Sequence, residues 1–132
     1  MENAHIVTRF DKDLNEIESL LVEMADKVAE QIKLSAQALK DGDNKLAQAV
    51  SKADSKINRL EEKIDEKAIR LIALRQPMAE DLRSAITTLK VSSSLERMGD
   101  YAKTLSYRIR EVDDFSAMKS VLRGIVQMSE KI

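Results

Sequence analysis

Apolar residues recur three or four positions apart along almost the whole chain, and this spacing constrains the fold most. It places the apolar residues on one face of an α-helix. One row comprises Phe10, Leu14, Ile17, Leu21, Met24, Val28 and Ile32. The next comprises Leu46, Val50, Ala53, Ile57, Leu60, Ile64, Ala68 and Leu71. A third stretch has two stripes in different phases, Leu82, Ile86 and Leu89, then Leu95, Met98, Ala102, Leu105 and Ile109.

Few residues interrupt this pattern, because the chain has one proline and three glycines in 132 residues. The stretch 41–44, with Gly42 at its centre, predicts one turn, and Pro77 predicts the start of a new helix. Asp113 and Asp114 form a weaker break. We therefore expect an all-α fold in which residues 1–110 form an elongated antiparallel three-helix bundle. Each helix would have about 30 residues, and residues 111–132 would form a linker and a short fourth amphipathic helix.

The composition excludes several classes of protein. The chain has no cysteine, so it has neither disulfides nor thiolate metal ligands. Its 22 basic and 23 acidic residues give no excess of positive charge for binding nucleic acid. No uncharged run exceeds six residues, whereas a membrane-spanning helix needs about 20. We expect a soluble, cytoplasmic protein without membrane insertion.

The last residues form another apolar stripe, comprising Phe115, Met118, Leu122, Ile125, Ser129 and Ile132. An apolar helix face of this size must pack on the bundle or against another chain. We predict a homo-oligomer that associates through Phe115, Met118, Leu122 and Ile125.

Residues for catalysis are scarce. The one histidine, His5, lies near the N-terminus, and the serines form no nucleophile elbow or Ser-His pair. The chain has no glycine-rich phosphate loop. We therefore expect a protein that is not an enzyme.

The positions of the carboxylates indicate a possible binding site. Glu96 and Asp100 share a helix face, and extending the Leu82 stripe by the same steps makes both residues face the bundle. A second polar stripe comprises Asp54, Asn58, Glu61 and Asp65. A hairpin that pivots at Pro77 would bring Asp54 level with Asp100, and Asn58 level with Glu96, about 30 Å from the turn.

These oxygen ligands favour a hard cation such as Mg²⁺, Ca²⁺, Mn²⁺ or ferric iron. We predict that the metal ligands are Asp54, Asn58, Glu96 and Asp100. Gly99 has no side chain, so a neighbouring backbone or a ligand could approach the helix closely at this level. The alternative is that the acids form a solvated helix face and that Gly99 serves helix packing.

Two further motifs are distinctive. They are Arg75-Gln76-Pro77 followed by Asp81-Leu82-Arg83, and Glu96-Arg97-Met98-Gly99-Asp100. With these motifs the sequence resembles the PhoU family of bacterial phosphate-signalling regulators. The likeness covers most of residues 5–110, including the first helix with Phe10, Asp11 and Leu14.

The resemblance implies a fold of two three-helix repeats, each with E/D-x-x-x-D motifs that in some members hold multinuclear metal clusters. Glu96 and Asp100 match this motif, whereas Asn58 replaces the second acid of the motif that begins at Asp54. The implied cofactor is a carboxylate-bound cluster of iron, zinc or a hard divalent cation. Residues 1–110 would be one repeat and residues 111–132 the start of a second, either in a fragment or in a naturally short protein.

The resemblance also implies a function. PhoU-like proteins are negative regulators of phosphate uptake and of phosphate-starvation signalling. They act as adaptors between the phosphate ABC transporter ATPase and a sensor histidine kinase, with only peripheral association with the membrane. Two alternatives stay open, a carboxylate-bound metal store or metalloenzyme and a purely structural helical module.

Overall fold

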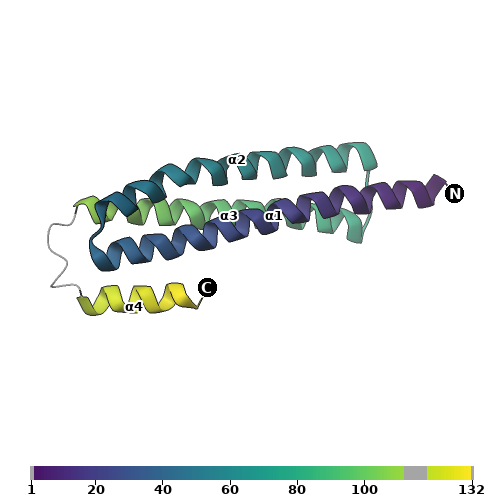
Figure 1. Cartoon of the computed structure of the whole chain (residues 1–132). Helices are drawn as coiled ribbons and strands as arrows, with labels where there is room; N and C mark the ends of the chain where they lie inside the picture. The colour runs from purple at the N-terminus through teal and green to yellow at the C-terminus, as the bar shows by residue number, and fades with distance from the viewer. Residues whose placement is uncertain (1, 112–118, 132) are drawn as a thin grey trace.

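The computed structural model describes residues 2–111 and 119–131, and these form four helices. They are α1 (Glu2–Asp41), α2 (Asn44–Arg75), α3 (Glu80–Glu111) and α4 (Lys119–Glu130). The three long helices run side by side as an elongated antiparallel bundle, and α4 lies along α1 (Figure 1). The predicted all-α class is confirmed, and the described part of the chain has no strand.

Both predicted turns are present. Gly42 has a φ of 64°, and the Oδ1 atom of Asp43 accepts a hydrogen bond of 3.0 Å from the Leu46 amide to cap α2. At the other end of α2, Gln76 adopts a left-handed conformation with a φ of 43°. Its N–H donates to the Ile72 carbonyl at 3.0 Å. The helix α1, with 40 residues, is longer than expected, whereas α2 and α3 have 32 each.

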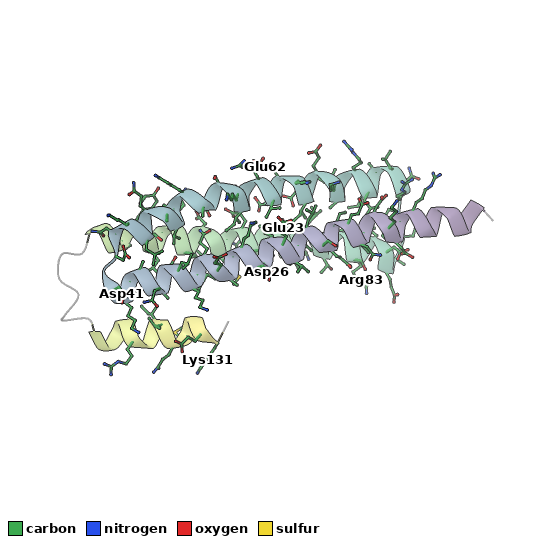
Figure 2. The ribbon with its side chains drawn as sticks, in the orientation of Figure 1. Glu23, Asp26, Asp41, Glu62, Arg83 and Lys131 are labelled. Carbon is green, nitrogen blue, oxygen red and sulfur yellow. The ribbon has the colours of Figure 1, made fainter. Side chains whose placement is uncertain are left out.

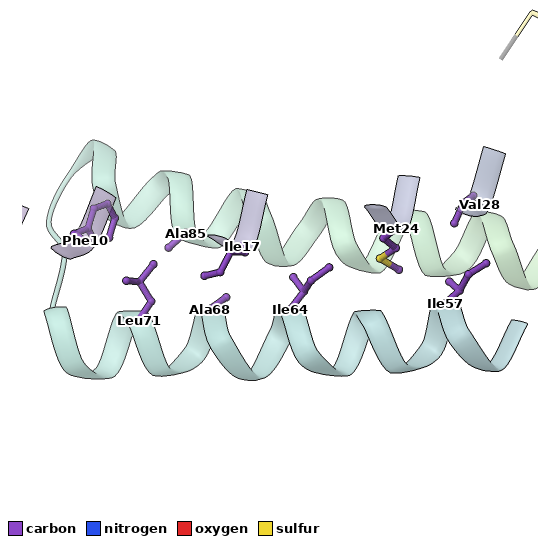
Figure 3. Packing of buried hydrophobic residues seen from close by; sticks show 9 residues of the cluster. All are labelled: Phe10, Ile17, Met24, Val28, Ile57, Ile64, Ala68, Leu71 and Ala85. Carbon is purple, nitrogen blue, oxygen red and sulfur yellow. The ribbon is translucent and has the colours of Figure 1, made fainter. Parts of the chain in front are cut away.

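The core is built from buried residues seven positions apart, the repeat of helices that pack side by side in coiled coils. On α1 the row comprises Phe10, Ile17, Met24, Gln31 and Ala38. On α2 it comprises Val50, Ile57, Ile64 and Leu71. Figure 3 shows the large side chains of α1 and α2 meeting along the bundle axis, with Ala85 contributed by α3.

The buried face of α3 differs from the predicted one. Its seven-residue row comprises the small residues Ala85, Ser92, Gly99 and Ser106. Ile86 is 40% exposed, and Ser93 and Asp100 of the same stripe are exposed as well. Leu89, by contrast, packs against the core, and Glu96 is half-buried. The predicted stripe was therefore wrong at Ile86, Ser93 and Asp100, because small side chains face the large ones of α1 and α2 and let α3 pack closely.

The short helix α4 packs back on the bundle. Ile125 contacts a cluster of buried residues formed by Ala38 and Leu39 of α1 with Ala47 of α2. Of the predicted interface, Phe115 and Met118 lie outside the described residues, as does the side chain of Leu122. Among the described helices, none is both long enough and apolar enough to cross a membrane.

Candidate site between α2 and α3

The charges of α2 are divided between its two flanks. The residues on the flank toward α3 are mostly acidic or amide, and comprise Asp54, Asn58, Glu61 and Asp65. Helical periodicity places Lys56, Lys63 and Lys67 on the opposite flank, toward α1. The acidic flank faces Glu96 and Lys103 of α3, so most of the predicted site residues lie where α2 and α3 pack together.

Asp54 is the buried centre of this group of polar residues, with 2% of its surface exposed. Its Oδ1 accepts a hydrogen bond from Nε2 of Gln31 at 3.4 Å, and its Oδ2 accepts one from Nδ2 of Asn58 at 3.4 Å. The Nζ atom of Lys103 lies 3.8 Å from Oδ2. A buried carboxylate needs such partners, because burial without them carries a large desolvation cost.

Gly99 brings the backbone of α3 against this carboxylate. A Cβ atom at Gly99 would lie 3.6 Å from Oδ1 of Asp54 and 3.3 Å from Cδ1 of Ile57. The Gly99 carbonyl accepts a second hydrogen bond from Nε2 of Gln31, at 3.1 Å. Asp54 therefore lies at the level of Gly99 and Lys103, which flank Asp100 in the sequence.

A second acidic group lies nearer the Pro77 turn. Burial raises the pKa of Glu61, and the neighbouring carboxylates of Glu96, Asp65 and Glu62 raise it further. Burial also raises the pKa of Asp65, and the nearby Ser92 hydroxyl offsets part of this rise. Oδ1 of Asp65 and Oγ of Ser92 are both buried without a well-formed hydrogen bond.

The four predicted ligands have different environments. Asp54 is buried and Asn58 and Glu96 are half-buried, whereas Asp100 is exposed. Among the residues that the structure describes, no three histidine, cysteine or carboxylate side chains converge to hold a metal ion. Asp54 already has Lys103 as its counter-ion. Metal binding by the four predicted ligands stays a prediction.

Sequence reasoning did not identify Gln31 and Lys103 as part of this group. A signal for Gln31 was present, because it is the one polar residue in the row Phe10, Ile17, Met24, Gln31 and Ala38. A polar residue at such a core position is retained where it has a buried partner. Lys103 gave no comparable signal among the many charged residues of α3.

Comparison with known proteins identifies the family. The family model described as the PhoU domain matches residues 21–109, which include all of α2 and α3 as far as residue 109. The chain belongs to the PhoU family. The resemblance seen in the two sequence motifs is thereby confirmed.

Several curated relatives carry the name phosphate-specific transport system accessory protein PhoU homolog. The relative from Zymomonas mobilis is 37% identical over 82% of this chain and 46% of its own length. That from Rhizobium meliloti is 35% identical over 98% of this chain and 55% of its own. That from Caulobacter vibrioides is 37% identical over 97% of this chain and 56% of its own. The chain thus spans about half the length of these PhoU relatives.

Proposed function

We propose that this chain acts in phosphate transport as a PhoU-type accessory protein without catalytic activity of its own. Its work would be the negative regulation of phosphate uptake and of starvation signalling. The observation that carries the proposal is the family membership, together with relatives in several bacteria that are named for the phosphate-specific transport system. A long bundle with charged flanks suits an adaptor, because it offers extended surfaces to two partners.

The proposed partners are the ATPase of the phosphate transporter and a sensor histidine kinase, both reached from the cytoplasm. The test is a pull-down with the purified ATPase and the purified kinase from the same genome. The matched bait is the variant Asp54→Ala, which removes the carboxylate that Gln31 of α1 and Lys103 of α3 contact. We expect the unmodified chain to retain at least one partner, and retention of neither would overturn the proposal.

A second test measures regulation in cells. We expect that expressing this chain in a strain that lacks its PhoU protein lowers the activity of a phosphate-starvation reporter when phosphate is plentiful. The expected repression is several-fold. Full reporter activity despite normal levels of the chain would contradict negative regulation.

We also propose that this chain binds a carboxylate-held metal. The proposed ligands are Asp54, Asn58, Glu96 and Asp100, of which Glu96 and Asp100 offer carboxylates four residues apart on α3. Elemental analysis of protein purified without chelator, with iron and zinc measured, tests this. The control is the pair Glu62→Ala/Glu66→Ala, which removes exposed carboxylates of the same spacing. Metal lost from Glu96→Ala/Asp100→Ala but not from the control would support a site, and protein without metal would contradict it.

A further inference from the structure

The flank of α2 that faces α1 carries a row of six cations, here called the basic ridge. It comprises Lys52, Lys56, Arg59, Lys63, Lys67 and Arg70. The steps of four, three, four, four and three residues place all six on one side of the helix. The ridge extends for about 27 Å at the rise of an α-helix. Five of its members are exposed, and Lys67 is half-buried.

A groove between α1 and α2 runs beside the ridge. One part has a volume of about 290 Å³, and its floor includes Leu34, Val50 and Ala53. The adjoining part, of about 300 Å³, has Leu60 on its floor. Lys27 and Lys56 line both parts, so the two parts adjoin. Small residues such as Ala49 and Ala53 leave room along α2 for another apolar surface.

The charge of this groove is strongly unbalanced. Its second part is lined by the cations Lys27, Lys56, Arg59 and Lys63, with Glu23 as its one carboxylate. Lys27 comes from α1, so both walls contribute positive charge. Cations gathered along a concave surface concentrate the electrostatic potential there and attract an acidic partner.

If the ridge served only the fold, acidic side chains of α1 would neutralise its positive charge. Glu16, Glu23 and Glu30 of α1 do recur every seven residues beside the groove. Within the described residues, however, no ridge cation forms an ion pair with α1. Arg70 pairs with Glu66 of its own helix at 3.7 Å, and both side chains are more than half exposed. Such a pair stabilises the fold very little.

We propose that the basic ridge and its groove bind an acidic helical segment of a partner protein. Cations one helical turn apart match Asp or Glu residues spaced three and four apart on a facing helix. The apolar floor would receive the apolar stripe of the same helix. A flat anionic membrane fits less well, because it would meet Glu62 and Glu66 on the exposed outer side of α2 (Figure 2 shows Glu62 there).

This inference goes beyond the proposed function, because it concerns what the basic ridge binds and does not depend on which protein supplies the acidic helix. The test uses the purified chain and a fluorescein-labelled helical peptide of 18 residues. The peptide carries glutamates three and four apart beside a stripe of leucines. Its affinity is measured by fluorescence anisotropy at low and at high salt.

The two decisive variants change the net charge of the chain by the same amount and differ only in where the substituted lysines lie. The ridge variant is Lys56→Glu/Lys63→Glu, and the matched control is Lys33→Glu/Lys90→Glu, at exposed positions that do not line the groove. We expect the ridge variant to bind the peptide at least about tenfold more weakly and the control to bind less than about twofold more weakly. A milder variant, Lys56→Ala/Lys63→Ala, should also weaken binding. Its helix content, measured by circular dichroism, shows whether the weaker binding comes from misfolding.

Three results would overturn the proposal. The unmodified chain could fail to bind the peptide, or the ridge and control variants could lose affinity equally, which would indicate an effect of net charge alone. Vesicles of phosphatidylcholine and phosphatidylglycerol could also bind in a ridge-dependent way when the peptide does not. A failed pull-down with the transporter ATPase, by contrast, would bear on the proposed function and leave this result unchanged.

Discussion

The side-chain amide of Gln31 on α1 donates a hydrogen bond of 3.1 Å to the backbone carbonyl of Gly99 on α3. The same nitrogen reaches Oδ1 of Asp54 on α2 at 3.4 Å. One side chain therefore ties all three long helices together at a single level. The close approach of α3 depends on Gly99, since a Cβ atom there would lie 3.3 Å from Cδ1 of Ile57.

We expect Gly99→Val to lower the free energy of unfolding by about 2 kcal/mol, because a branched side chain would overfill this contact. Urea unfolding followed by circular dichroism measures the change. Gly124→Val is the control, since a Cβ atom at Gly124 would have no neighbour within 4 Å. Equal losses in the two variants would show that close packing at Gly99 is unimportant.

Asp54 and Lys103 offer a test of the buried ion pair. We expect Asp54→Ala to lower the free energy of unfolding by about 2–4 kcal/mol, because it leaves buried amide donors and a cation without their acceptor. Asp54→Asn keeps the shape and should cost less. In a double-mutant cycle with Lys103→Met, the two losses should sum to more than the loss in the double variant. Additive losses would mean that the 3.8 Å contact contributes nothing.

The raised pKa of Asp65 predicts a pH dependence. A carboxyl whose pKa is higher in the folded state binds more protons there than in the unfolded chain. Its contribution to stability therefore falls as pH rises from the ordinary value of 3.8 through the raised pKa. We expect Asp65→Asn to stabilise the protein at pH 7, by less than about 1 kcal/mol because the carboxyl is partly solvated. The gain should shrink toward pH 4 in urea unfolding, and a gain that grows on acidification would contradict the assignment.

Gln76 holds a left-handed backbone conformation, with φ 43° and ψ 55°, at the end of α2. Glycine adopts this conformation without the steric cost of a Cβ atom. We expect Gln76→Gly to raise the free energy of unfolding by about 1 kcal/mol. Gln76→Ala keeps the Cβ atom and should give no such gain in the same thermal or urea measurement. An equal gain from alanine would show that the backbone is not strained.

Ile125 anchors α4 to the cluster around Ala38 and Leu39. We expect Ile125→Asp to release α4 while leaving the three-helix bundle folded, because the main core cluster does not include this residue. Hydrogen exchange should then become faster in residues 119–130 and stay unchanged in α2. Unfolding of the whole chain in this variant would show that α4 is essential to the bundle.

Self-association of the chain stays a prediction. Light scattering at high micromolar concentration tests it, and a monomer at that concentration would refute it. Ile125 packs within its own chain. An interface that uses this residue would therefore require α4 to leave α1, so Ile125→Asp should weaken any dimer.

The sequence predicted the helices because their signals are local. Gly42 and Asp43 end one helix and cap the next. The apolar rows of α1 and α2 are buried or pack against the core, except at Ala53, which is exposed. The buried face of α3 was not predictable in the same way. Its large residues suggested a stripe through Leu82 and Ile86, but the helix buries Ala85 and Ser92. Which face turns inward depends on the size of the opposing side chains.

The candidate site, like the fold, was predictable from the sequence only in part. The level of Asp54 followed from counting residues from Pro77, because antiparallel helices of fixed rise bring such positions together. The sequence by itself thus determined the helices, the turns and the approximate level of the acidic residues. Only the tertiary structure decided that Asp54 is buried and paired with Lys103 while Asp100 faces solvent. The physical reason is that helix rotation is set by the fit of side chains from three helices at once, and no single helix carries that information.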